Sequence, residues 1–205
     1  MLQTRLALII SYVFHPIFLP TYAVLFLMWC NPYYFMAIDS RQGIALLSVI
    51  LVNSVLLPLI ALIILRRSGL IKDLEITDRK ERAIPFLIMI FFIFWTYFVV
   101  KFRLQLPEIL TDVMWGAFLS IMTAYFVNIL YMKVSLHAMG MGSLIAIIIA
   151  GSFVSLYGLA GVLATGILLA GLVGSSRLIL KAHTQREVYY GYLMGFAAQM
   201  AAFMM

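Results

Sequence analysis

Long apolar runs separated by short polar connections dominate the chain. Seven of these runs approach or exceed the roughly 20 residues that a helix needs to cross the hydrocarbon core of a bilayer. The pattern therefore predicts an all-α, polytopic integral membrane bundle of about seven (six to seven) transmembrane helices, forming a single transmembrane domain over residues 1–205. The runs cover residues 6–30, 43–65, 83–100, 113–132, 138–157, 158–176 and 188–205.

Local features refine this prediction. Pro16 and Pro20 should kink the first helix, because proline removes a backbone donor and clashes with the preceding turn. A very short turn near Gly158 should join the fifth and sixth helices, and the last run is rich in small residues and is the least secure span. The residues expected at the membrane interface are Trp29, Tyr33 and Tyr34.

Composition agrees with a membrane protein and excludes a soluble globular domain. Hydrophobic residues make up 65% of the chain and charged residues 11%, whereas soluble domains have about 45–50% and about 25%. The mean hydropathy is +1.09. The net charge of +6 resides in short connections, which favours an anionic lipid surface or anionic substrate over nucleic acid. The one cysteine, Cys30, excludes an intrachain disulfide.

The basic residues are distributed unequally between the two sides of the membrane. If the runs alternate in direction, the N-terminus and residues 66–82, 133–137 and 177–187 share one side. That side collects all but three of the 14 Lys and Arg residues. The positive-inside rule places it in the cytoplasm, although cations that bind a ligand would not report topology. The three on the other side are Arg41, Lys101 and Arg103.

The most specific chemical pattern lies after the sixth run, where Ser176 and Arg177 are followed by His183 and Glu187. We expect His183 and Glu187 to share one helix face, because they are four residues apart. A carboxylate on one imidazole nitrogen fixes the tautomer and makes the other nitrogen a nucleophile or base. Arg177 can bind a phosphate with its planar guanidinium.

A second stretch, Ser135-Leu136-His137, lies at the predicted start of the fifth helix. The free N–H groups and the dipole of a helix N-terminus favour an anion. Ser135 adds a hydroxyl donor, and His137 can protonate a leaving oxygen. A serine that only caps the helix is the competing interpretation.

The third stretch contains Lys72 and Arg79, which would lie on one face if the stretch were helical. They have acidic neighbours, so a solvated, salt-bridged loop is an equal alternative. Lys80 or Arg82 is then an alternative phosphate ligand. The acidic neighbours are Asp73, Glu75, Asp78 and Glu81.

All three stretches fall on the same predicted side of the membrane. Several cations, two histidines and a carboxylate paired with a histidine supply what phosphoryl transfer through a phosphohistidine requires. Cations neutralise the phosphoryl oxygens, one histidine attacks, and the other protonates the departing alkoxide. We expect no metal or other cofactor. The third histidine, His15, precedes Pro16 in the first helix and is expected to make an internal hydrogen bond.

Together the three stretches resemble the motifs of the type 2 phosphatidic acid phosphatase superfamily, which shares its site with vanadium haloperoxidases. The family motifs are K-x6-R-P, P-S-G-H and S-R-x5-H-x3-D. The order and spacing match over residues 72–187, with Lys80, Val134, Leu136 and Glu187 as departures. The chain reads Lys72-x6-Arg79-Lys80, Val134-Ser135-Leu136-His137 and Ser176-Arg177-x5-His183-x3-Glu187.

The resemblance implies a role for each matching residue. His183 would be the nucleophile, Glu187 its orienting carboxylate and His137 the general acid. The phosphate ligands would be Lys72, Arg79, Ser135 and Arg177.

We therefore expect a metal-independent lipid phosphate phosphatase or phosphotransferase, a hydrolase of phospholipid metabolism in the inner (cell) membrane of a bacterium. Its partners would be a lipid phosphate or diphosphate substrate and membrane lipids, and not nucleic acid. The sequence leaves the lipid, the compartment and the oligomeric state open.

Other functions are compatible with parts of the sequence. The departures at Lys80, Leu136 and Glu187 also suit a catalytically silent relative that binds or moves an anionic lipid. A small transporter is less favoured, because the chain has no internal duplication. A prenyltransferase is less favoured still, because Asp73 and Asp78 do not form paired acidic boxes.

Overall fold

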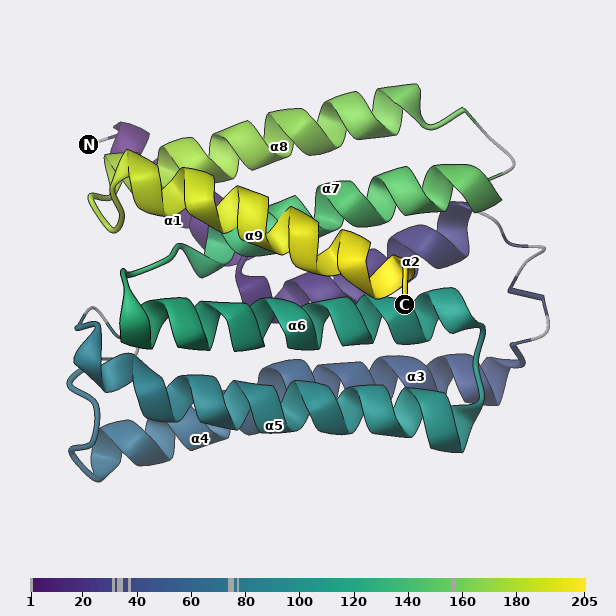
Figure 1. Ribbon diagram of the computed structural model, residues 1–205, viewed down its shortest axis with the longest axis horizontal. Helices are drawn as coiled ribbons and strands as arrows, with labels where there is room; N and C mark the ends of the chain where they lie inside the picture. The colour runs from purple at the N-terminus through teal and green to yellow at the C-terminus, as the bar shows by residue number, and fades with distance from the viewer. Residues whose placement is uncertain are drawn as a thin grey trace.

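The apolar runs fold into helices that lie roughly side by side in one bundle (Figure 1). The computed structural model describes residues 2–30, 32, 35–36, 38–73, 76, 78–155 and 158–205, and these contain helices but no strand. Tyr33, Tyr34, Glu75 and part of the turn near Gly158 lie outside the described residues. The long helices are α1 (Leu2–Val13), α2 (Leu19–Cys30), α3 (Ser40–Leu51), α4 (Leu57–Arg67), α5 (Ala83–Val99), α6 (Glu108–Leu130), α7 (Leu136–Val154), α8 (Ala160–Ile179) and α9 (Gln185–Phe203).

The predicted all-α membrane bundle is confirmed. In the described part of the chain, six helical segments are long and apolar enough to cross a membrane. The seventh predicted run corresponds to α9, which is not among them and begins with three polar residues. The six segments are Leu2–Cys30, Ser40–Arg67, Lys80–Leu104, Glu108–Leu130, Leu136–Phe153 and Ala160–Ile179.

Proline shapes two of these spans. In the first, α1 ends at Val13 and a short 3-10 turn, Pro16–Phe18, separates it from α2. The predicted kink is therefore a complete break. In the second, a π-helical turn, Val52–Leu56, precedes Pro58. The wider turn accommodates a proline ring, which would clash with a carbonyl in a regular helix.

The fourth span begins earlier than predicted, at Glu108 rather than at residue 113. The predicted run began after Glu108 and Asp112, which are both charged. Glu108 lies in the first turn of α6, where the positive end of the helix dipole favours an acidic side chain.

The alternation of the helices places the chemically distinctive stretches at one end of the bundle. Figure 1 shows the N-terminus and the connections after α4, α6 and α8 together at the left. The connections after α2, α5 and α7 lie at the right. The stretches that contain Arg82, His137 and His183 therefore reach the same end, as the sequence predicted.

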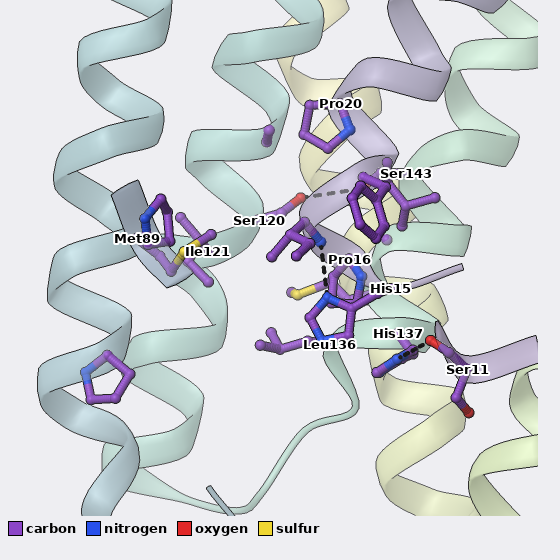
Figure 2. A pocket seen from close by; sticks show the side chains of 18 of the residues that line it. Ser11, His15, Pro16, Pro20, Met89, Ser120, Ile121, Leu136, His137 and Ser143 are labelled. Carbon is purple, nitrogen blue, oxygen red and sulfur yellow. Dashed lines mark hydrogen bonds between the residues drawn. The ribbon is translucent and has the colours of Figure 1, made fainter. Parts of the chain in front are cut away.

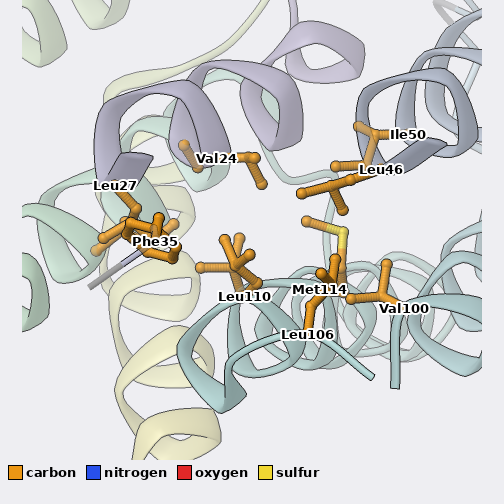
Figure 3. Close-up of a cluster of buried hydrophobic side chains, with 12 residues drawn as sticks. Val24, Leu27, Phe35, Leu46, Ile50, Val100, Leu106, Leu110 and Met114 are labelled. Carbon is orange, nitrogen blue, oxygen red and sulfur yellow. The ribbon is translucent and has the colours of Figure 1, made fainter. Parts of the chain in front are cut away.

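The main hydrophobic core lies where α2, α3 and α6 meet (Figure 3). Its central side chains are fully buried, and burying a Leu or Met side chain contributes about 1.5–3 kcal/mol. Because burial by protein rather than lipid defines this cluster, it fixes the relative positions of the helices. The fully buried members include Val24, Leu27, Leu46, Ile50, Leu110 and Met114.

Helices α7 and α9 approach each other closely enough for their backbones to touch. A Cβ atom at Gly195 would overlap the Met139 carbonyl, and one at Gly191 would lie 2.7 Å from the Ser135 carbonyl oxygen. Small residues permit this kind of helix contact in membranes. The contact fixes the start of α7, which carries His137, against the start of α9, which follows His183.

We expect Gly195→Leu to lower the stability of the bundle, because the side chain has no space beside Met139. The cost should reach or exceed the roughly 1–3 kcal/mol typical of overpacking. Thermal unfolding in detergent measures it. Gly171→Leu is the matched control, since nothing lies within 4 Å of a Cβ at Gly171 in the middle of α8. Equal melting temperatures for the two variants would contradict the close packing.

Candidate functional site

A cavity of about 920 Å³ lies inside the bundle, lined by residues of α1, α2 and α4 to α9 and of the connection between α8 and α9. All three histidines of the chain line it (His15, His137 and His183), and so do several cations. The remainder of the lining is mainly aliphatic and aromatic. Figure 2 shows the part around His15, His137 and Ser11. The cations are Arg82, Lys133, Arg177 and Lys181.

His183 and Glu187 form the predicted pair. His183 Nδ1 lies 3.0 Å from Glu187 Oε2. The prediction that the two residues share one helix face was wrong, because His183 precedes α9. Thr184 is the N-cap of α9, and Glu187 folds back to accept the Thr184 N–H at 3.0 Å in a capping box. The same carboxylate oxygen thereby reaches the imidazole.

The surroundings of His183 keep its ring neutral. The side chain is only 4% exposed. Burial, reinforced by the positive charges of Lys133, Arg82 and Arg177 and by His137, lowers the pKa of His183 from 6.5 to about 3. A neutral ring that donates from Nδ1 to Glu187 leaves a lone pair on Nε2, which has no hydrogen-bond partner among the described residues. Nε2 is therefore available as a nucleophile.

We expect the ring protons of His183 to show no titration between pH 5 and pH 8, because a pKa of about 3 leaves the ring neutral throughout that range. NMR of histidine-labelled protein in detergent measures this, with the His183 signals assigned by their loss in His183→Gln. The unfolded protein is the control and should titrate near the ordinary value of about 6.5. A midpoint near 6.5 in the folded protein would contradict the neutral ring.

His137 lies in the first turn of α7, as predicted. Ser135 is the N-cap of that helix and accepts the Ala138 N–H. Ser135 is fully buried and does not line the cavity. His137 Nε2 lies 3.1 Å from the Ser11 carbonyl oxygen. Because a carbonyl only accepts, Nε2 carries the proton, and Nδ1 is the ring nitrogen that this hydrogen bond does not use.

The break in the first span supplies the carbonyl that holds His137. In a continuous helix the His15 N–H would bond to the Ser11 carbonyl four residues earlier. Here the His15 N–H donates to the Tyr12 carbonyl instead, at 3.3 Å. The Ser11 carbonyl is thus released from the helix and accepts from His137. Pro16, which ends the helix, therefore contributes to the placement of a residue on a different span.

Arg177 reaches the cavity from the last turn of α8. Its Nη1 donates to Ser11 Oγ at 3.2 Å, and Ser11 Oγ also lies 3.1 Å from Ser176 Oγ. Ser176 is 1% exposed and donates to the Val173 carbonyl. These bonds attach the end of α8 to α1 and hold the guanidinium beside the histidines.

Two more of the predicted phosphate ligands, like Ser135, lie outside the cavity wall. Lys72 is exposed and pairs with Glu81 at 3.2 Å, and its hydrogen bond to Glu81 raises its pKa. Arg79 donates to the carbonyls of Asn128 and Ile129 at the end of α6. Neither residue lines the cavity. In the described part of residues 68–79 the chain is irregular, so the helix that would have aligned them is not formed.

Arg82 and Lys133 occupy the cavity wall instead. Arg82 is 9% exposed and donates to the Ile76 carbonyl at 2.9 Å and the Val134 carbonyl at 3.4 Å. Its Nη2 has no partner among the described residues. Lys133 donates to the Ala182 carbonyl at 3.0 Å, and burial followed by the charge of Arg82 lowers its pKa. The sequence offered Arg82 as an alternative and did not identify Lys133, although it precedes Ser135 by only two residues.

No protein-family model, curated protein or solved structure matches this chain.

Proposed function

We propose that the chain is a membrane lipid phosphatase or phosphotransferase that cleaves a lipid phosphate or diphosphate through a phosphohistidine at His183. The observation that supports it best is the composition of one cavity. Its wall combines a histidine paired with a carboxylate, further histidines and several cations with a long apolar surface inside a membrane bundle. An amphiphile with an anionic headgroup has both of these properties.

The residues of the cavity can carry both halves of such a reaction. The lone pair on His183 Nε2 attacks phosphorus while the bond to the lipid oxygen breaks. Protonated His137 gives the proton on its Nδ1 to that oxygen. Neutral His137 then takes a proton from the water that attacks the phosphohistidine, which returns both rings to their starting states. Arg82, Lys133 and Arg177 offset the charge of the phosphoryl oxygens.

The shape of the cavity favours a substrate that enters from the bilayer. Leu8, Tyr12 and Leu59 line the cavity and are also among the exposed large hydrophobic residues of the chain. They belong to α1 and α4, within two of the spans. A lipid tail can therefore remain on apolar surface while its headgroup reaches the cations. We place the protein in a bacterial inner membrane as part of this proposal.

Phosphate release by the purified protein tests the function. The assay would use detergent micelles, EDTA and a panel of lipid phosphates and diphosphates, including phosphatidate, phosphatidylglycerol phosphate and isoprenyl diphosphates. We expect release from at least one lipid and none from a His183→Gln preparation. No release from any member of the panel, with the folded state confirmed by thermal unfolding, would overturn the proposal.

A second candidate is a binding protein that does not catalyse turnover. Leu136 lines the cavity beside His137, at the position where the resembling family has glycine. Its bulk can hold a phosphate away from His183. This candidate predicts binding of orthovanadate or a lipid phosphate without hydrolysis. An acid-labile phosphoryl group trapped on His183 would exclude it.

A further inference from the structure

Each of the three histidines is anchored through one ring nitrogen. His183 is held at Nδ1 by Glu187 and His137 at Nε2 by the Ser11 carbonyl. His15 is the N-cap of the 3-10 turn, and its Nδ1 accepts the Ile17 N–H at 3.4 Å. In each ring the other nitrogen has no hydrogen-bond partner among the described residues. The rings of His15 and His137 meet edge to face, with centroids 5.1 Å apart (Figure 2).

The anchors determine which rings can donate a hydrogen bond when all three are neutral. His183 and His137 carry their protons on the anchored nitrogens, so each presents a lone pair at its other nitrogen. His15 is reversed, because Nδ1 accepts a backbone N–H and must carry the lone pair. Its proton therefore resides on Nε2. His15 is thus the one neutral imidazole of the three whose unbonded nitrogen is a donor.

We propose that His15 is a substrate-binding residue whose Nε2–H donates to an oxygen of the bound phosphate. The position fits this role, because His15 lines the same cavity as the cations and its ring meets that of His137. The Pro16 break sets the backbone that makes the cap, so the orientation of the ring does not depend on the ligand. This inference rests on the proposed function, since it assigns a further ligand to the same phosphate.

Two substitutions separate the donor from the cap. His15→Asn retains an acceptor at the position of Nδ1 and loses the donor at Nε2. His15→Gln places an amide N–H₂ near the position of Nε2 and loses the short cap. A hydrogen bond to a charged group contributes about 1.5–3 kcal/mol, which corresponds to roughly 10-fold to 150-fold in affinity. We expect His15→Asn to weaken binding by that factor without a change in melting temperature, and His15→Gln to restore most of the binding.

The experiment measures the affinity of the full-length protein in detergent for orthovanadate and inorganic phosphate, together with kcat and KM for a lipid hydrolysed by the wild type. Hydrolysis with unchanged affinity and KM in His15→Asn would overturn the role of His15 and leave the function standing. If His15→Asn weakens phosphate binding but the wild type hydrolyses no lipid, the binding role of His15 stands and the proposed phosphatase function is overturned. Equal loss of affinity in both variants, with lowered melting temperatures, would reduce His15 to a cap.

Discussion

Replacing His183 with glutamine should reduce the turnover of a lipid phosphate at least about a thousandfold, because the proposed covalent intermediate forms on its Nε2. Glutamine can retain a polar contact with Glu187 but has no basic nitrogen to attack phosphorus. The ring it replaces is 4% exposed and held at 3.0 Å by the carboxylate. The loss should therefore appear in kcat, with the affinity for phosphate little changed.

Single-turnover kinetics with a labelled lipid phosphate measure both the loss of turnover and the missing phosphohistidine. Arg186→Gln is the matched control, since Arg186 is exposed in the first turn of α9 and does not line the cavity. It should behave as the wild type. Turnover that survives in His183→Gln would assign the nucleophile to another residue or show that the cavity hydrolyses by direct attack of water.

The same substitution should reduce activity at Arg82 and stability at Arg79. Arg82→Gln should lower kcat/KM by about 10²–10³, the usual cost of removing one group that stabilises charge in the transition state. Arg79→Gln should leave kcat/KM within a few fold, because Arg79 bonds to carbonyls at the end of α6 and lies outside the cavity. Its effect should be a lower melting temperature.

Steady-state kinetics and thermal unfolding of both variants, measured side by side, decide between these positions. Arg82→Lys is a further test, because it retains the charge and loses the fork that contacts Ile76 and Val134. It should recover part of the activity. A large loss in Arg79→Gln with no loss in Arg82→Gln would restore the assignment implied by the motif spacing.

The sequence predicted the spans and the end of the bundle at which the distinctive residues gather. Hydropathy is sufficient to locate the spans, because a membrane helix satisfies its own backbone hydrogen bonds and so forms with little dependence on tertiary contacts. The prediction failed where charge and apolarity compete. Glu108 was excluded from a helix that it begins, and α9 was counted with spans that are more apolar than it is.

The site was predictable only where contacts are local in the sequence. His183 and Glu187 are four residues apart and meet because Glu187 belongs to a capping box whose N-cap is Thr184. Lys72 was chosen by spacing, but spacing cannot show that Glu81 holds it at the surface. Lys133 is held at the cavity by the Ala182 carbonyl, which is remote in the sequence, and His15 meets His137 of a different span. For His15 the adjacent proline was a signal that the ring would leave the helix.

The Ser11 carbonyl gives the broken first span an evolutionary consequence. A substitution at Pro16 that allowed the helix to continue would supply the missing backbone bonds and would be favoured by selection for stability alone. The same change would return the Ser11 carbonyl to His15 and take it from His137. Selection for the site and selection for a stable helix therefore act against each other at Pro16, although the side chain that depends on the break, His137, lies on a different span.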